Sequence, residues 1–94
     1  MINVAVCCAN GKMGQEVIKA VEANNGMSLV AKIDIKDGEF ATIKDAKNSV
    51  KIDVLVDFTQ PKSIYENALY CLNNGINIVI GTTEPIEGIL KITC

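Results

Sequence analysis

The sequence predicts a doubly wound α/β domain, in which helices cover both faces of a parallel β-sheet. Two observations carry this prediction. Short apolar segments rich in Val and Ile alternate with segments whose apolar residues have helical spacing. Asn-Gly pairs at 25–26 and 74–75 end two of the helical segments. Strands joined by helices make right-handed crossovers and therefore lie parallel, and 94 residues suffice for a single core.

The first strand is expected at Ile2–Cys7, because this segment is apolar and contains β-branched residues. A helix is expected from Lys12 to about Asn24. Its core-facing positions, at spacings of four, seven and eight residues, are Met13, Val17, Ala20 and Val21.

The middle of the chain predicts two further strands with little regular structure between them. Ser28–Asp34 reads as the second strand and Asp53–Phe58 as the third. The segment 35–50 is polar and mixed, and it contains one short helix at Ile43–Asn48.

The next helix is expected to begin at Pro61, because the fixed φ and missing N–H of proline suit a first helical turn. The last strand is expected at Asn77–Gly81, whose continuous apolar character is typical of a parallel strand covered on both faces. The stripe of the helix that faces the core is expected to be Ile64, Ala68, Cys71 and Leu72.

Composition excludes several functional classes. The chain is 49% hydrophobic and 21% charged with a net charge of −2, and its basic residues are scattered, so nucleic acid is not an expected partner. No apolar run reaches the roughly 20 residues that span a bilayer, and the N-terminus lacks the pattern of a signal peptide, which together predict a cytoplasmic protein. The absence of histidine and the spacing of the four cysteines argue against a metal site.

The segment after the first strand has the features of a nucleotide-binding turn. Cys8, Gly11 and Gly14 have the spacing C-x-x-G-x-x-G at the start of the first helix, where free N–H groups and the helix dipole favour a pyrophosphate. Asp34 follows Gly14 by twenty residues, the distance at which a carboxylate binds an adenosine ribose. The combination predicts a dinucleotide site. The alternative is a glycine-containing connection that binds nothing.

Cys8 departs from the glycine pattern. If position 8 has a backbone conformation that L-residues readily adopt, a cysteine there costs little free energy. A positive φ or a contact with the phosphate would cost about 1–3 kcal/mol. A second interpretation is a reactive thiol, because a helix N-terminus lowers the pKa of a nearby cysteine.

Two other loops follow strands at the same edge of the predicted sheet, where ligands bind in open parallel sheets. They are FTQP at 58–61 and GTT at 81–83, and their threonines offer hydroxyl and backbone groups. The alternative for FTQP is a cap and turn ahead of the proline-led helix.

These motifs resemble the N-terminal part of the dihydrodipicolinate reductase (4-hydroxy-tetrahydrodipicolinate reductase) family, NAD(P)H-dependent enzymes of lysine and diaminopimelate synthesis. The resemblance runs from Met1 to Thr83. Its most specific pieces are ANGKMG at 9–14, DFTQP at 57–61 and GTT at 81–83. The turn of that family is G-A-x-G-[KR]-M-G, so Cys8 stands at its first glycine.

The resemblance implies a Rossmann-like domain that binds NADH or NADPH, with the pyrophosphate at 8–13, the adenosine ribose at Asp34 and the nicotinamide half along 81–83. Asp34 would repel a 2′-phosphate and Lys36 could partly neutralise it, so dual use with NADH preferred is expected. The predicted cofactor-binding residues are Cys8, Ala9, Asn10, Gly11, Lys12, Met13, Asp34, Lys36, Phe58, Thr59, Gly81, Thr82 and Thr83.

No residue is assigned a catalytic role. The resemblance implies that substrate binding and proton supply belong to a second domain with an HHxxKxDAPSG motif, which nothing in this chain matches. The expected organisation is a dinucleotide-binding domain at 1–83 and an atypical tail at 84–94 with a short helix at 85–92, inactive by itself and self-associating through the edge of the fourth strand. The alternatives are the nucleotide-binding domain of an aspartate or homoserine dehydrogenase and a non-catalytic binding module.

Overall fold

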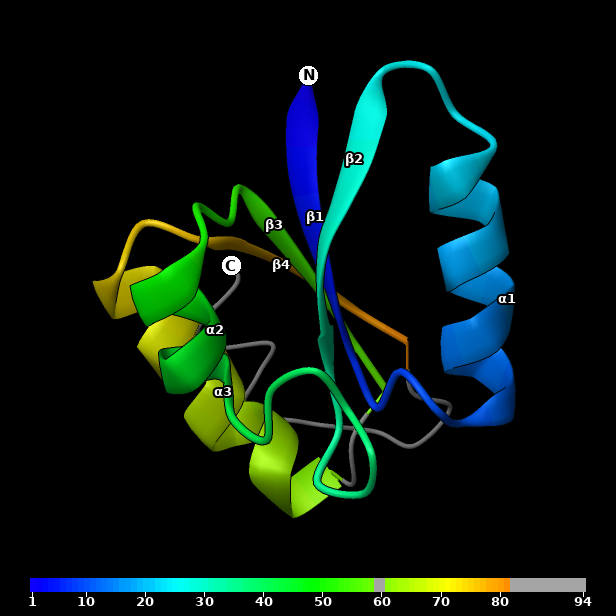
Figure 1. Ribbon diagram of the computed structural model, residues 1–94. Helices are drawn as coiled ribbons and strands as arrows, with labels where there is room; N and C mark the ends of the chain where they lie inside the picture. The colour runs from blue at the N-terminus through cyan, green and yellow to red at the C-terminus, as the bar shows by residue number, and fades with distance from the viewer. Residues whose placement is uncertain (59–60, 82–94) are drawn as a thin grey trace.

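The computed structural model describes residues 1–58 and 61–81, and the side chains of 61–64 are not included in that description. A single sheet of four parallel strands lies between two layers of helices, in the order β2-β1-β3-β4 (Figure 1). The strands are β1 (Ile2–Cys7), β2 (Met27–Ile33), β3 (Val54–Asp57) and β4 (Asn77–Ile80). The helices are α1 (Lys12–Glu22), α2 (Ile43–Ser49) and α3 (Pro61–Asn73).

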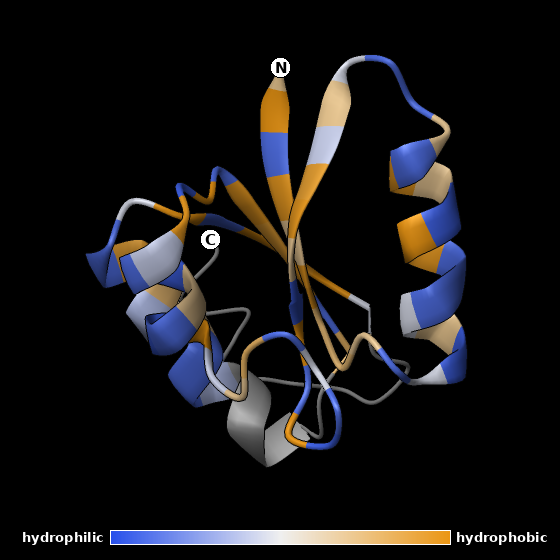
Figure 2. Ribbon diagram, viewed as in Figure 1, coloured by the Kyte–Doolittle hydropathy of each residue, from blue (hydrophilic) through white to orange (hydrophobic). Residues whose placement is uncertain are grey.

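The helices cover both faces of the sheet, which confirms the doubly wound α/β fold. Helix α1 lies on one side, and α2 and α3 lie on the other (Figure 1). The strands are mostly hydrophobic, whereas the helices carry many hydrophilic residues (Figure 2). One core cluster joins Val4 and Val6 to Ile18 of α1. The other joins Leu55 of β3 to Cys71 of α3.

The strand order sets the place of the site. The chain passes from β1 outward to β2 and then returns to the other side of β1, where it forms β3. Strand β1 pairs in parallel with both neighbours, so Cys7 lies opposite Ile33 on one side and Asp57 on the other. The connections leaving β1 and β3 therefore diverge at the carboxyl edge of the sheet. In open α/β sheets the crevice at such a switch point is where ligands bind.

The core face of α1 differs from the predicted stripe by one position. Gly14, Ile18 and Val21 are buried, whereas Met13 is 57% exposed and Ala20 is exposed. The prediction was based on the spacing of the apolar side chains. Gly14 instead lies on the core face, because the helix begins very close to the preceding turn. Met13 is left at the surface as a result.

Two other burial predictions were wrong. Leu72, expected in the buried stripe of α3, is 52% exposed, while Ala68 and Cys71 are fully buried as predicted. Val79 of β4 is 54% exposed, so among the described residues no helix covers that face of the fourth strand. On the sheet face opposite α3, helix α1 packs mainly over β1 and β2, and Val56 of β3 is partly buried against the same cluster.

None of the helices in the described part of the chain combines the length and the apolar character required to cross a membrane.

Two leucines allow the core assignment to be tested with one kind of substitution. Leu55→Ala removes a side chain that is 0% exposed and leaves a cavity, so it is expected to lower the free energy of unfolding by about 2–5 kcal/mol. Leu72→Ala removes one that is 52% exposed and is expected to cost less than about 1 kcal/mol. Urea denaturation followed by circular dichroism measures both. Similar losses would show that Leu72 packs against the core after all.

Candidate nucleotide-binding site

The turn between β1 and α1 is a tight hydrogen-bonded loop. The amide of Gly11 donates to the carbonyl oxygen of Cys8 at 3.1 Å, and the amide of Gln15 donates to the carbonyl of Gly11 at 3.0 Å as the first helical bond. Ala9 is fully buried beneath the turn. The chain thus reverses from strand to helix within four residues, directly above the switch point of the sheet.

Cys8 lies in the left-handed region at φ 62. This conformation is easily adopted by glycine, whereas a residue with a Cβ is strained by roughly 1–2 kcal/mol. Of the two outcomes considered for this position, the structure therefore gives the strained one. The glycine that the pattern calls for at position 8 has a backbone reason that does not depend on a ligand.

Gly14 is required by packing. A Cβ built at this position would overlap the carbonyl oxygen of Cys8 and would lie 2.9 Å from that of Ala9. Both neighbours are backbone atoms that cannot move without breaking the turn. Glycine therefore lets α1 start directly against the turn, as the fingerprint of the sequence predicts.

The N-terminus of α1 is open. Gly11 is its N-cap with extended backbone at φ −74 and ψ 166, no side chain caps it, and its first turn holds no acidic residue. The first amides of a helix have no intrahelical partner, and the helix dipole places partial positive charge there. Lys12 and Met13 occupy this turn, and both side chains are exposed. The arrangement is suited to an anion.

Asp34 lies one residue beyond β2, at the same edge of the sheet. Its Oδ2 accepts a hydrogen bond from the amide of Asn10 at 3.0 Å, and its Oδ1 accepts one from the amide of Lys36 at 3.1 Å. The structure thus brings together the predicted acid and the predicted turn. The carboxylate faces the loop that would hold a pyrophosphate.

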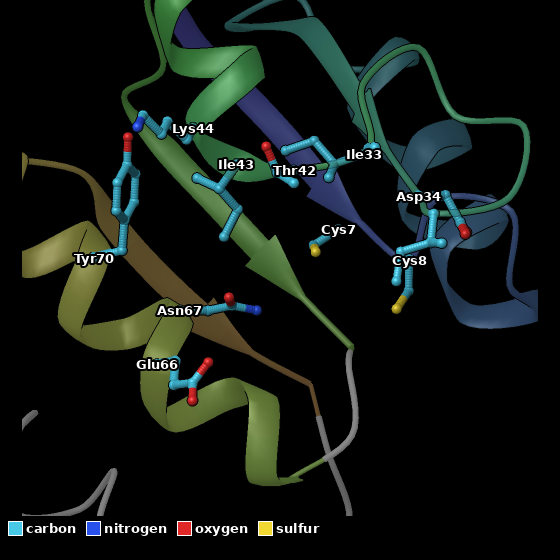
Figure 3. A pocket seen from close by; sticks show the side chains of 12 residues that line it. Cys7, Cys8, Ile33, Asp34, Thr42, Ile43, Lys44, Glu66, Asn67 and Tyr70 are labelled. Atoms are coloured by element: carbon cyan, nitrogen blue, oxygen red, sulfur yellow. The ribbon is translucent and has the colours of Figure 1, made fainter.

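A cavity of about 360 Å³ opens beside the turn, on the α2 and α3 side of the sheet (Figure 3). This volume is within the range of small-molecule sites. Cys8 and Asp34 form one wall, Thr42 and Lys44 come from the start of α2, and Tyr70 comes from α3. The remaining lining residues are Cys7, Ile33, Ile35, Ala41, Ile43, Glu66 and Asn67.

A buried carboxylate lies at the end of β3, next to Cys7 and Asn67, which line this cavity. Asp57 is 0% exposed, and its Oδ2 accepts a hydrogen bond from the Asn67 side chain of α3 at 2.9 Å. Burial of a charged group is tolerated where hydrogen bonds compensate the loss of water. The bond also ties the end of β3 to the helix that follows it.

The thiols near Asp57 are held in their protonated form. Burial, followed by the negative charge of Asp57, raises the pKa of the Cys71 thiol to about 11, and the same two causes raise the pKa of Cys7 still further. The pKa of Cys8 is also raised, by burial first and by Asp57 and Asp34 next. The raised pKa of Cys8 contradicts the reactive-thiol interpretation, which required the helix N-terminus to lower it.

Phe58, directly after β3, and Gly81, directly after β4, meet at this edge of the sheet. Phe58 is half-buried, and a Cβ at Gly81 would overlap its ring, so glycine at 81 lets the ring lie against the chain. Gly81 is itself held by its amide, which donates to the carbonyl of Asp57 at 2.9 Å. Thr59, Thr82 and Thr83 lie outside the described residues, as does the short helix expected at 85–92.

Sequence reasoning missed the wall of the cavity formed by the helices. Thr42 had a usable signal, because its hydroxyl accepts from the amide of Asp45 at 3.1 Å and threonine is a common N-cap. That cap places the start of α2 at the carboxyl edge of the sheet. Glu66, Asn67 and Tyr70 gave no such signal, since their position depends on how α3 packs. Within the described residues, no group of three or more His, Cys, Asp or Glu side chains is arranged to hold a metal ion.

The parallel sheet, the glycine turn at its switch point and the acid after β2 define a Rossmann-like α/β domain. Residues 2–89 match the family described as dihydrodipicolinate reductase, N-terminus. The chain belongs to this family.

Individual relatives agree with this assignment. The chain is 43% identical over 87 residues to the 4-hydroxy-tetrahydrodipicolinate reductase of Corynebacterium urealyticum, covering 93% of this chain and 33% of that protein. A solved structure, dipicolinate-bound dihydrodipicolinate reductase from Paenisporosarcina sp. TG-14, superposes with a TM-score of 0.85 at 32% identity, covering 99% of this chain and 42% of that one. D-galactose-1-dehydrogenase from Rhizobium etli gives a TM-score of 0.82 at 20% identity, covering 98% and 32%, which shows the shared fold alone. The chain thus spans about a third of the length of the curated relatives.

The strain at Cys8 is testable by its removal. Cys8→Gly is expected to raise the free energy of unfolding by up to about 1 kcal/mol, because relief of the left-handed conformation exceeds the extra flexibility of glycine in the unfolded chain. Cys8→Ala is the control, since it removes the thiol but keeps the Cβ, and it should give no gain. Thermal unfolding measures both variants. A stabilisation by alanine equal to that by glycine would place the cost in the thiol and not in the backbone.

Proposed function

We propose that this chain is the NAD(P)H-binding part of a reductase that acts on 4-hydroxy-tetrahydrodipicolinate. The observation that carries the proposal is the juxtaposition of an open helix N-terminus with the Asp34 carboxylate, joined by the Asn10 amide at 3.0 Å, at the switch point of a parallel sheet. Family membership supports the reaction, because the relatives are named for it.

The residues present fit a dinucleotide. The amides at the start of α1 would bind the pyrophosphate; Gly11 leaves that surface without a side chain, and Gly14 lets the helix begin directly against the turn. The hydroxyls of the adenosine ribose would donate to Asp34, with the adenine directed to the neighbouring cavity of about 360 Å³. The nicotinamide half would extend toward Phe58 and Gly81, with Thr59, Thr82 and Thr83 as further predicted contacts. When bound, the reduced nicotinamide ring supplies the hydride.

No residue of this chain is given a catalytic role in the proposal. Its residues bind and orient the cofactor, and we expect the 94-residue chain by itself to show no turnover of the substrate. A cytoplasmic location stays a prediction. The strained turn at Cys8 is the observation that favours the alternative, a binding module with weak or no affinity for the cofactor.

Isothermal titration with NADH tests the proposal directly. Asp34→Asn keeps the shape of the side chain and removes its charge, so it is expected to weaken NADH binding by about tenfold or more, because hydrogen bonds to a charged group contribute about 1.5–3 kcal/mol. Glu22→Ala, an exposed acid at the far end of α1, is the control and should bind as the wild type does. If wild-type protein takes up neither NADH nor NADPH, the alternative of a binding module without cofactor is correct.

Cofactor preference is expected to favour NADH. The negative charge of the Asp34 carboxylate repels a 2′-phosphate. The amide of Lys36 donates to this same carboxylate at 3.1 Å, and the positive charge of the Lys36 side chain can offset part of the repulsion. Lys36→Ala should lower NADPH affinity by about two- to fivefold, the range of an exposed ion pair, and leave NADH affinity nearly unchanged. Lys47→Ala on α2 is the control. An unchanged NADH to NADPH ratio would make Lys36 a solvated charge with no part in specificity.

The proposal includes self-association of this chain through the outer edge of β4. In the described sheet β4 is the last strand on its side, and Val79 is 54% exposed on it. An open edge presents backbone N–H and C=O groups that pair with another strand, and a second copy of the same strand supplies a complementary edge.

Sedimentation velocity at several concentrations measures this association. A dimer that grows with concentration is expected for the wild type. Val79→Lys places a charge on the edge strand and should shift the protein to monomer. Leu72→Lys, at a similarly exposed site on α3, should leave the distribution unchanged. A wild-type protein that stays monomeric at high concentration would contradict the proposal.

A further inference from the structure

Asn10 joins the turn after β1 to the loop after β2. Three hydrogen bonds join this turn to the end of β2 and the loop that follows it. The amide of Ala9 donates to the carbonyl of Ile33 at 3.2 Å, and the amide of Asn10 donates to Asp34 Oδ2 at 3.0 Å. The third bond is made by a side chain, because Asn10 Nδ2 donates to the carbonyl of Lys36 at 2.5 Å.

The main chain of Lys36 is consequently held from two directions. Its amide donates to Asp34 Oδ1 at 3.1 Å, and its carbonyl accepts from the Asn10 side chain. The Asn10 side chain therefore acts on Asp34 indirectly. It fixes the residue whose amide orients the second carboxylate oxygen.

The loop between Asp34 and Phe40 is tightly folded, which makes this restraint effective. Asp37 has a φ of 57, and a Cβ at Gly38 would lie 2.7 Å from the carbonyl oxygen of Asp34. The loop then returns to β2, where the amide of Asp34 donates to the carbonyl of Phe40 at 2.9 Å. Its far end is thus anchored to the sheet. Its near end, at Lys36, is anchored to the turn by Asn10.

The carboxylate of Asp34 still has acceptor capacity in this arrangement. Each oxygen accepts one of the two amide bonds described above, and an ionised carboxylate has about four lone-pair sites. Ribose hydroxyls can therefore bind without displacing either amide. A carboxylate already fixed in orientation binds a diol with less loss of conformational freedom than one that rotates freely.

We infer that Asn10 is a positioning residue for the adenosine ribose: through the main chain of Lys36, its side-chain amide holds the Asp34 carboxylate in the orientation that accepts the ribose hydroxyls. The inference rests on the proposed function. The Asn10 side chain is not expected to touch the nucleotide, so the inference gives Asn10 a positioning role in place of the direct cofactor contact predicted for it from the sequence.

The test compares ADP with 2′-deoxy-ADP, measured by isothermal titration. Both ligands carry the adenine and the pyrophosphate. They differ only in the 2′-hydroxyl, from which Asp34 would accept a hydrogen bond. Wild-type protein is expected to bind ADP about tenfold more tightly than 2′-deoxy-ADP, because one charge-assisted hydrogen bond accounts for a difference of this size. Asn10→Ala should reduce this preference to about threefold or less, with the affinity for 2′-deoxy-ADP changed less than twofold.

Further variants separate positioning from a general effect on the turn. Asn25→Ala, an exposed asparagine at the opposite edge of the sheet, should keep the tenfold preference. Asn10→Asp keeps the shape but removes the donor to Lys36, so it should lose the preference even if its added charge weakens both ligands. In the Asp34→Asn background, Asn10→Ala should have no further effect on the ratio.

Each remaining outcome overturns the inference. Equal weakening of ADP and 2′-deoxy-ADP by Asn10→Ala would make Asn10 a structural residue of the turn. A preserved tenfold preference in folded Asn10→Ala and Asn10→Asp would show that Asp34 is oriented without it. A wild-type protein that binds ADP without preferring it over 2′-deoxy-ADP would remove Asp34 as the ribose acceptor. Binding of neither ligand by the wild type would overturn the proposed function itself, and the inference with it.

Discussion

The close approach of α1 to the turn before it is the constraint on which the rest of the structure depends. Gly14 allows this approach, because any Cβ there would overlap the carbonyl of Cys8. The helix therefore begins directly at the switch point, with its uncapped amides at the carboxyl edge of the sheet. As a result of the same approach, Gly14 lies on the core face of α1 and the Met13 side chain is exposed. The turn that it approaches holds Cys8 in the left-handed conformation, where the sequence has no glycine.

The two halves of the candidate site are one hydrogen-bonded unit. The turn after β1 and the loop after β2 come from separate parts of the sequence, yet the Asn10 amide and side chain bond to Asp34 and to Lys36. This explains why an acid twenty residues from the glycine pattern is informative, since the parallel pairing of β1 with β2 brings both to one edge.

The buried carboxylate at the end of β3 helps to keep three nearby thiols neutral. Asp57 is buried at the end of β3 with a bond to Asn67, and together with burial its charge raises the pKa values of Cys7, Cys8 and Cys71. A thiolate beside the turn would repel a pyrophosphate. The protonated form of Cys8 is thus compatible with an anionic ligand, and its cost is confined to backbone strain.

The sequence by itself determined the fold class, the order of strands and helices, and the placement of the turn and Asp34 at one edge. These follow from local patterns, namely apolar periodicity, glycine spacing and the rule that parallel strands end together. Only the tertiary structure decided that Gly14 replaces Met13 on the core face, that Leu72 is exposed, and that Glu66 and Tyr70 line a cavity. Burial depends on which surfaces the packed elements present to one another, and hydrogen bonds such as that from Asn10 to Lys36 join residues 26 positions apart. No local pattern encodes such contacts, because they arise when the two loops are brought together by the sheet.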